Sequence, residues 1–354
     1  MSSFYFRNRK EKIKEQLKEK SLILILNPIN CFYLTNFTSS SAMIILTNKK
    51  DYYVTDNRYY EAAKNNIKEF EVISFKKEKL FFLKKIIKNI NTIFIEEDFI
   101  NYKNYKNILT IKNCEIRDIS DKLKEIRAIK DELEIENIKK ACNISKKVIN
   151  EIIKKKIYEK KSEVELKNFI NIVGLKKHSS SLAFEPIVAY DANSSIPHYY
   201  STYLSNKKLP EYNILIDFGL CYNNYKSDLT RTLLLNKIKN KIAKKLEDSY
   251  KIIEETIARV KEKLRAGISV KSIDNLVRNF FKENKVDENF LHSTGHGVGL
   301  EIHELPYISA KQNYVLKENN VITIEPGLYF EGIGGIRIEN TILIKKNGYE
   351  ILTE

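Results

Sequence analysis

Residues 292–304 read HSTGHGVGLEIHE and constrain the chain more than any other stretch of its sequence. They contain three of the five histidines, His292, His296 and His303, and glycines stand between them. Glycine lets a backbone approach a ligand closely, and neutral imidazole is a common metal ligand and acid–base group near pH 7. We therefore expect His296 to bind a metal and His292 and His303 to face a substrate. A glycine-kinked pair of strands with solvated histidines is the alternative for this stretch taken alone.

Four carboxylates stand in or beside apolar, strand-like segments. Asp217 interrupts ILIDF, Glu325 ends VITIE, and Glu339 ends GIRIE. Asp228 follows Asp217 by eleven residues, after the sequence YNNY at 222–225, which predicts a hairpin turn. An unpaired carboxylate in a dry interior is costly, so each needs a partner, and a metal is the strongest one. A salt-bridged strand residue is the alternative for either aspartate considered alone.

The four carboxylates and His296 together supply enough ligands for two divalent cations, which shared carboxylates would bridge at about 3.5–4 Å. The set has one nitrogen and no sulfur, which favours Mn²⁺, then Co²⁺, Fe²⁺ or Zn²⁺. The four cysteines form no CxxC pair, which argues against a thiolate zinc site and a disulfide framework.

The composition fits a soluble globular protein of one large or two ordinary domains, with 354 residues, 43% of them hydrophobic and 30% charged. The net charge is +15, but 51 lysines outnumber 10 arginines and alternate with glutamate and isoleucine along helical stretches. We interpret them as solvated helix faces and expect no specific nucleic-acid partner. The early residues show no apolar signal core, and the run Leu22–Leu26 is too short to span a bilayer. We therefore expect a cytoplasmic protein without a membrane partner.

Alternating strand and helix patterns predict a small α/β domain over residues 1–120. Its expected strands are 21–26, 41–46, 52–55, 71–75 and 92–97, and its expected helices are 7–20, 60–70, 79–90 and 101–109. Residues 121–354 predict an α+β domain in which long helices cover a sheet of hairpins. Its helices are expected over 121–156, from the capping box Ser162-x-x-Glu165 onward, over 236–264, and over 270–283 behind a Ser269 cap. Its strands are expected over 211–220, 231–235, 320–330 and 335–344.

The order Asp217, Asp228, His296, Glu325, Glu339 resembles the pita-bread metallopeptidases, which include methionine aminopeptidase, aminopeptidase P and prolidase. The strings SDLTRT, HSTGHGVGLEIHE, EPGLYFEG and GIRIEN are similar to the aminopeptidase P and prolidase branch. CFYLTNFTSSSAMIIL and YYVTDNRYYEAA resemble the creatinase-like N-terminal domain of that branch. The resemblance implies a creatinase-like domain over 1–120 and a pita-bread catalytic domain over 121–354, with a curved antiparallel sheet covered by long helices.

The resemblance also implies a role for each matching residue. Asp217 is expected to chelate one metal, Asp228 and Glu339 to bridge both, and His296 and Glu325 to bind the other. Glu325 would also move a proton from the metal-bound water to the leaving nitrogen. His303 would contact the scissile carbonyl, His198 in IPHYY would be a further active-site histidine, and His292 and Arg337 would line the substrate site.

Several of these residues have plainer interpretations. His198 alone could be a surface histidine, and Arg337 could simply neutralise the carboxylates. Tyr329, four residues past Glu325, either lines the substrate pocket or belongs to the core. His178 matches no motif and is expected to be a solvated loop residue. Asn340 stands where relatives often have Asp, and a neutral residue there could loosen a hydrogen bond behind Glu339.

The expected function is that of a dinuclear, Mn²⁺-preferring Xaa-Pro aminopeptidase, which removes the residue before proline from a peptide through attack of a metal-bridged hydroxide. An Xaa-Pro dipeptidase is the nearest alternative. An alternative of another class is an inactive pita-bread binding protein, which would be expected to lose metal ligands, whereas all five are present here. The family also implies a homodimer.

Overall fold

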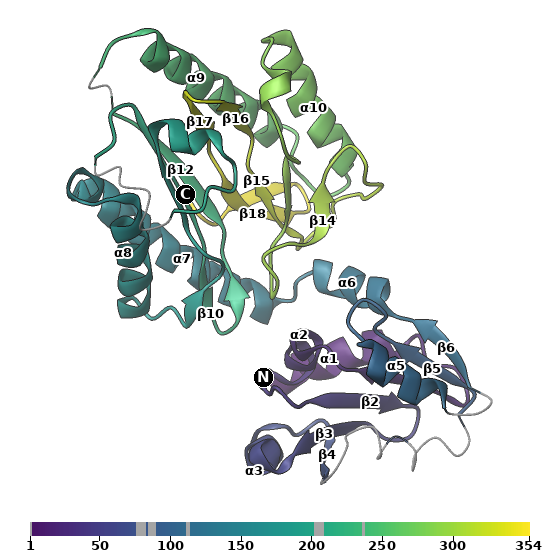
Figure 1. The fold of residues 1–354 in the computed structure, drawn as a ribbon. Helices are drawn as coiled ribbons and strands as arrows, with labels where there is room; N and C mark the ends of the chain where they lie inside the picture. Colours follow the sequence, from purple (N-terminus) through teal and green to yellow (C-terminus); the bar gives the residue numbers. More distant parts are fainter. Residues whose placement is uncertain (1, 76–82, 84–89, 111–113, 202–208, 236–237) are drawn as a thin grey trace. The chain divides into compact units, whose positions relative to one another are not determined.

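Figure 1 shows the fold as a computed structural model, which describes residues 2–75, 83, 90–110, 114–201, 209–235 and 238–354. The chain divides into two compact units, Met1–Arg127 and Ala128–Glu354. Residue 120, where the sequence placed the domain boundary, begins α6 (Ser120–Ala128), and the first unit includes that helix up to Arg127.

The first unit contains one six-stranded mixed sheet with the strand order β4-β3-β2-β1-β5-β6. β1, β2 and β3 pair antiparallel, whereas β4, β5 and β6 join in parallel. All five residues of β1 (Ser21–Ile25) are buried, as its unbroken apolar run predicts. The other strands are β2 (Met43–Thr47), β3 (Tyr52–Asp56), β4 (Glu71–Phe75), β5 (Thr92–Ile95) and β6 (Glu115–Asp118). The other helices are α1 (Ser2–Lys14), α2 (Pro28–Thr35), α3 (Asn57–Asn66) and α5 (Tyr102–Leu109).

The five strands predicted for this unit are confirmed, but one predicted helix needs correction, and α2 and β6 were not predicted. The helix expected over 7–20 already ends at Lys14 and begins at Ser2. α2 was not predicted, although Asn27 caps it through its side chain and Pro28 occupies the first turn, both ordinary start signals. The helix expected over 79–90 lies, except for residues 83 and 90, outside the described residues.

The strands of the second unit pair antiparallel throughout the described residues, in sheets ordered β11-β10-β7, β12-β9-β8, β14-β13-β15-β18-β19 and β16-β17. The turn predicted at YNNY is confirmed, because Tyr222 pairs with Tyr225 and both asparagines between them have positive φ. The strands before the histidine segment are β7 (Ser181–Leu182), β8 (Ile187–Tyr190), β9 (Asn213–Phe218), β10 (Leu220–Tyr222), β11 (Tyr225–Lys226) and β12 (Leu229–Leu234). The later strands are β13 (Gly295–Gly297), β14 (Glu304–Ile308), β15 (Val321–Ile324), β16 (Gly327–Phe330), β17 (Gly334–Arg337), β18 (Asn340–Lys345) and β19 (Gly348–Ile351).

Two of the predicted strands are interrupted at their carboxylates. The run 320–330 forms β15 and β16 with Glu325 in the gap, and the run 335–344 forms β17 and β18 with Glu339 in the gap. A continuous apolar pattern cannot reveal such a break, because the residues on both sides remain strand-like. Each break places a glutamate between two strands, where its N–H donates to a different segment: that of Glu325 to the Thr294 carbonyl and that of Glu339 to the Thr230 carbonyl.

Four long helices pack on these sheets, namely α7 (Glu132–Lys154), α8 (Glu163–Lys176), α9 (Lys241–Lys261) and α10 (Val270–Glu283). The helix expected over 121–156 is instead divided into α6 and α7, because the Asp131 side chain caps α7 in a capping box with Glu134. The capping box at Ser162 is confirmed. Ser269 precedes α10 as expected, but its side chain makes no capping hydrogen bond. Among the described residues, no helix is both long enough and apolar enough to cross a membrane.

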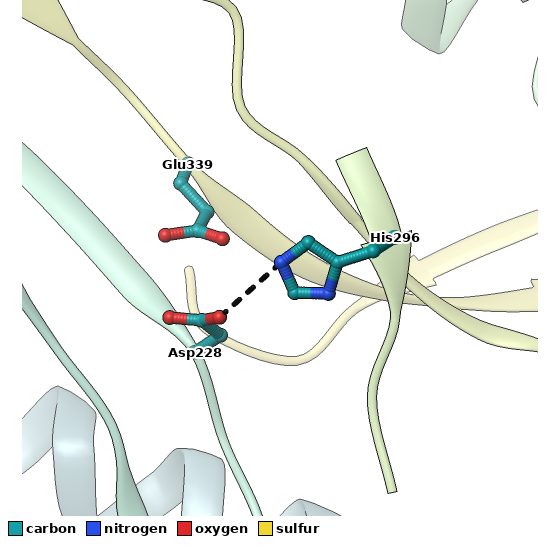
Figure 2. Close-up of side chains that lie close together, drawn as sticks. All are labelled: Asp228, His296 and Glu339. Carbon is teal, nitrogen blue, oxygen red and sulfur yellow. Dashed lines mark ion pairs between the residues drawn. The ribbon is translucent and has the colours of Figure 1, made fainter. Parts of the chain in front are cut away.

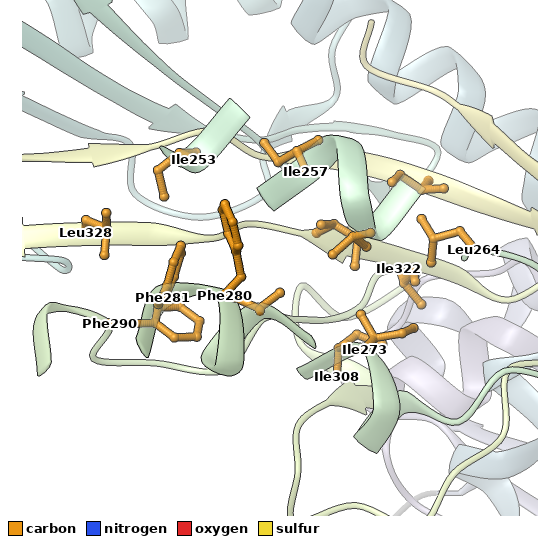
Figure 3. Close-up of a cluster of buried hydrophobic side chains, with 14 of the residues drawn as sticks. Ile253, Ile257, Leu264, Ile273, Phe280, Phe281, Phe290, Ile308, Ile322 and Leu328 are labelled. Carbon is orange, nitrogen blue, oxygen red and sulfur yellow. The ribbon is translucent and has the colours of Figure 1, made fainter. Parts of the chain in front are cut away.

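The core of the second unit lies partly between α9, α10 and the strands beneath them (Figure 3). Phe281 on α10 is fully buried, and its ring meets that of Phe290 edge-on with centroids 5.1 Å apart. Such a pair adds a directional contact to the burial of apolar area. Phe281 therefore helps to hold α10, and the strands packed on it, in place.

Replacing Phe281 by alanine should lower the free energy of unfolding of the second unit by about 3–5 kcal/mol, because a large buried ring leaves a cavity. Chemical denaturation followed by circular dichroism measures the change. Ile172→Ala on α8 is the matched control, since Ile172 is 52% exposed and should change stability by less than about 0.5 kcal/mol. Equal losses in the two variants would contradict the assignment of Phe281 to the core.

Candidate active site

A cavity of about 470 Å³ in the second unit gathers the predicted site residues. Nine of them line it, namely His198, Asp217, Asp228, His292, His296, His303, Glu325, Arg337 and Glu339. Tyr329 lies behind this lining, 3% exposed, and its hydroxyl contacts both His292 and Arg337. His178 stays outside the cavity, in an exposed turn after α8, as predicted.

Strand register explains how distant carboxylates come together. Ile324 pairs with Asn340 in β15–β18, and Gly327 pairs with Arg337 in β16–β17, so one register continues across both breaks. That register places Glu325 opposite Glu339. In the neighbouring hairpin, Asp217 pairs with Thr230, which lies two residues past Asp228. The Thr230 hydroxyl donates a 2.7 Å hydrogen bond to Glu339 Oε2 and so joins the two hairpins.

Figure 2 shows Asp228, His296 and Glu339 converging from three separate segments, and their ligand atoms lie within 4.8 Å of one another. The His296 Nδ1 atom is 3.1 Å from the Gly297 carbonyl, to which it can only donate, so Nε2 presents its lone pair. That Nε2 atom lies 3.6 Å from Asp228 Oδ2 and 3.3 Å from Glu325 Oε1. A lone pair facing two carboxylate oxygens is repulsive unless a positive charge lies between them.

Two further atoms indicate a cation. Oδ1 of Asp217 and Oδ1 of Asp228 are buried and have no hydrogen-bond partner among the described residues. Buried polar atoms are normally paired, and an oxygen-rich cluster with one imidazole matches what hard divalent cations bind. The residues present therefore fit metal ions held by Asp217, Asp228, His296, Glu325 and Glu339.

The cluster holds its carboxyl groups under electrostatic stress. Burial raises the pKa of Asp228 well above its ordinary value, and Glu339, Asp217 and Glu325 raise it further. Burial, followed by Glu325 and Asp217, likewise raises the pKa of Glu339 well above the usual range. Burial also raises the pKa of Glu325. Cations that bind these carboxyl groups compete with protons, so metal affinity should depend on pH.

Arg337 connects the cluster to the substrate side of the cavity. Its Nη2 atom donates to Asp217 Oδ2 at 2.6 Å, and its Nη1 atom donates to the Tyr329 hydroxyl at 2.6 Å. The Tyr329 hydroxyl in turn lies 2.8 Å from His292 Nε2, while His292 Nδ1 lies 2.8 Å from the Ser293 carbonyl. Both ring nitrogens of His292 are thus engaged within the protein, so His292 is not placed to be a metal ligand. Burial alone would lower the pKa of Arg337, but Tyr329, Asp217 and Glu325 raise it well above its ordinary value.

His303 and His198 stand at the open side of the cavity. The His303 ring lies edge-on to that of His296, with centroids 4.4 Å apart. Desolvation, followed by His296 and His198, lowers the pKa of His303 to about 4. His303 is therefore neutral at pH 7 and can donate one N–H to a substrate. His198 is exposed on the loop after η3 (Asp191–Ser195), beside Pro197, whose carbonyl accepts from Arg337.

Sequence reasoning did not single out Thr230 or Arg231. Thr230 is fully buried and orients Glu339, whereas Arg231 donates to the Glu339 carbonyl at 2.5 Å. Asn340 accepts hydrogen bonds from Arg231 and from the Thr353 hydroxyl, so its neutral side chain still takes part in the support behind Glu339. Thr230 on β12 lies two residues past Asp228, which precedes the strand, and this spacing in extended backbone was the available signal.

Comparison with known proteins assigns the family. The model of Metallopeptidase family M24 matches residues 136–346, and that of the Creatinase/Prolidase N-terminal domain matches residues 9–129. The chain belongs to metallopeptidase family M24. The predicted fold is confirmed: an M24 pita-bread domain follows a creatinase-like N-terminal domain.

The similar M24 proteins carry two kinds of name. The Xaa-Pro dipeptidase of Pyrococcus furiosus is 35% identical over 355 residues, covering 98% of each chain. Among solved structures, the Xaa-Pro dipeptidase from Bacillus anthracis has a TM-score of 0.92 at 30% identity, covering 99% of this chain and 98% of that one. The X-Pro aminopeptidase from Thermotoga maritima MSB8 has a TM-score of 0.86 at 33% identity, covering 96% and 97%. The chain is therefore a metallopeptidase of the Xaa-Pro peptidase family.

The raised carboxyl pKa values predict that loss of one carboxylate stabilises the metal-free M24 cluster but weakens metal binding. A raised pKa means that the folded protein binds more protons than the unfolded chain, so metal-free stability falls as pH rises above the ordinary carboxyl pKa of about 4. Asp228→Asn removes one such group. Without metal at pH 8, this variant should melt at a higher temperature than the wild type. Its Mn²⁺ affinity should fall at least about tenfold, since losing even an outer partner of a ligand costs about 10–100-fold.

Thermal melts at pH 5.5 and 8, together with calorimetric Mn²⁺ titration, measure both effects. Asp248→Asn is the matched control, because Asp248 sits in a half-exposed pair with Lys244 on α9. A metal-free Asp228→Asn protein that melts below the wild type at pH 8 would contradict the strained cluster.

Proposed function

We propose that this chain is a dinuclear, metal-dependent Xaa-Pro aminopeptidase, which releases the N-terminal residue of peptides with proline in second position. The observation that carries the proposal is the charge of the cavity wall. Among the described residues that line the cavity, Arg337 is the only lysine or arginine. Its guanidinium is buried and already donates to Asp217, Tyr329, Thr230 and the Pro197 carbonyl.

This distribution favours longer peptides over dipeptides. The carboxylate of an Xaa-Pro dipeptide lies one residue from the scissile bond and must be desolvated inside the cavity. A buried carboxylate needs a cation or several N–H donors. The described lining beyond the cluster instead offers mostly apolar and aromatic side chains, including Phe184, Pro186, Ile187, Tyr199 and Tyr307. A longer peptide carries a neutral amide at the same position.

The cavity residues divide into holding, proton-transfer and substrate-contact groups. Asp217, Asp228, His296, Glu325 and Glu339 would hold two divalent cations, which, when bound, lower the pKa of water and polarise a carbonyl. Mn²⁺ is the proposed metal because four of the five ligands are carboxylates.

Glu325 is the proposed proton carrier. Burial raises the pKa of its carboxyl above the ordinary value, which favours uptake of a proton by this group. The Thr323 hydroxyl and His296 both lie against Oε1. We therefore assign Glu325 Oε2 to accept a proton from the attacking water. The same oxygen then returns this proton to the leaving proline nitrogen. That nitrogen belongs to a tertiary amide and must be protonated as it leaves.

Three histidines complete the site. His303 donates its N–H to the oxygen of the scissile carbonyl, where negative charge develops. His198 faces the same space from the loop that follows η3, and His292, fixed by Tyr329, presents its ring to the substrate. The proposal includes a cytoplasmic homodimer that acts on Xaa-Pro peptides without nucleic-acid or membrane partners, supported by the family resemblance and the dispersed lysines.

With Mn²⁺, the wild type should cleave an Xaa-Pro-Yaa tripeptide with a kcat/KM at least about tenfold above that for the Xaa-Pro dipeptide, a difference of about 1.4 kcal/mol in transition-state binding. Chromatography of the products measures both, with Xaa-Ala-Yaa as the control peptide and chelated enzyme as the control protein. Efficient turnover of the dipeptide alone would identify a dipeptidase instead. Metal content near zero together with no hydrolysis would favour the inactive binding protein.

Glu325→Gln should lower kcat by about 10²–10⁴-fold, the usual contribution of a positioned acid–base group, because an amide cannot carry the proton. Steady-state kinetics at saturating Mn²⁺, with metal content measured in the same samples, separates this loss from poorer metal binding. Lys139→Met, which breaks a half-exposed pair with Glu350, serves as the control. A metal-loaded Glu325→Gln enzyme with wild-type kcat would exclude Glu325 as the proton carrier.

A further inference from the structure

A buried ion pair outside the cavity lining joins the segment before α7 to the histidine segment. Lys130 Nζ donates to Glu304 Oε1 at 2.7 Å, and the two side chains are 0% and 6% exposed. We propose that this pair is a positioning device that holds the loop 298–304 in the shape that places His303 beside His296. The proposal rests on the proposed function only where it concerns the role of His303 in catalysis.

Lys130 is fixed on its own side. Its backbone N–H donates to the Asn319 carbonyl at 3.0 Å, and Ile129 forms an antiparallel bridge with Asn320. The Asn320 side chain donates to the Ala128 carbonyl at 2.7 Å. Asn320 directly precedes β15, the strand that leads to Glu325. The ammonium group is therefore presented from a segment tied to the sheet of the active site.

The loop is folded around the Glu304 carboxylate. The Glu301 N–H donates to Glu304 Oε2 at 3.2 Å, and the Gly299 N–H donates to the Glu301 carbonyl at 3.1 Å. A Cβ atom at position 299 would lie 2.3 Å from Glu304 Oε1, so only glycine lets the carboxylate occupy this place. Gly299 therefore makes room for an ion-pair partner rather than for a ligand.

The same carboxylate lies next to both histidines. Glu304 pairs with Gly297 across β13–β14, directly after His296, and it follows His303 in the chain. Glu304 is buried and lies outside the cavity lining, whereas the preceding His303 is exposed and lines the cavity. A buried ion pair is weak evidence for stability, but removing the Lys130 ammonium takes the cation away from a buried carboxylate, which favours movement of Glu304. Movement of Glu304 would displace the adjacent His303.

Lys130→Met tests the device. Hydrogen exchange of the amides in 298–305 should become faster than in the wild type, and kcat for the tripeptide should fall by about 100-fold at little changed KM and full metal content, since a shift of about 1 Å can cost that much. Ile253→Ala, in the core around α9, is the control for general destabilisation. It should speed exchange around α9 and leave the loop and kcat unchanged.

The double variant Lys130→Met/Glu304→Gln removes both charges and should restore loop protection and at least about tenfold of the lost kcat, because a neutral pair leaves no uncompensated buried charge. Loop exchange that stays at the wild-type rate in Lys130→Met overturns the proposal, whatever the activity. The proposal is also overturned if Ile253→Ala speeds exchange in the loop and lowers kcat as much as Lys130→Met does. If Lys130→Met does not fold, Gly299→Ala, which keeps both charges but crowds the carboxylate, should give the same fast loop and low kcat.

If the wild type does not cleave Xaa-Pro peptides, the proposed function fails. The exchange comparison still decides whether the ion pair holds the loop.

Discussion

Mutual repulsion among four carboxylates, three of them buried, is the constraint around which the catalytic unit is built. Asp217, Asp228 and Glu339 are each less than 10% exposed, and Glu325 lies against the same cavity. Arg337 is the one arginine in the described lining, and it pairs with Asp217 alone among them. The cluster is therefore incomplete without further positive charge, and the family assignment identifies that charge as metal ions. The sheet register and the Thr230 hydrogen bond maintain an arrangement that the carboxylates would not adopt unaided.

Much of this fold could be predicted from the sequence, because long apolar runs fix strands such as β1 and amphipathic stretches fix helices such as α9. The parts that could not be predicted depend on local chemistry or distant partners. The helix predicted over 121–156 is divided because the Asp131 cap competes with an unbroken apolar period. Lys130 carries no sequence signal of its own, since it is one of 51 lysines and its partner lies 174 residues away.

Sequence patterns also cannot tell which carboxylates belong to the candidate site. Glu96 ends the apolar run TIFIE just as Glu325 ends VITIE, and both carboxylates directly follow a strand. Glu96 nevertheless accepts hydrogen bonds from the Leu26 and Asn27 N–H groups and from the Asn30 side chain. Glu325 instead faces the lone pair of His296. The sequence pattern of one strand predicts that a carboxylate at its end is buried. Only the groups around that carboxylate in the folded protein show whether it accepts structural hydrogen bonds, as Glu96 does, or could bind metal, as Glu325 could.

Buried carboxylates also hold the loops that carry His198 and His303. Glu163, which is fully buried, accepts hydrogen bonds from the Tyr190 N–H, the Asn193 side chain and the Tyr199 hydroxyl, and so fixes the loop on which His198 lies. Glu304, paired with Lys130, occupies the corresponding place under His303. Glu163 and Glu304, which are surrounded by donors, thus hold the loops in place. The carboxylates of the cluster face one another instead and need bound cations to offset their repulsion. Whether an acidic side chain of this site binds metal or positions a histidine loop therefore depends on which groups surround it, not on the number of acidic residues.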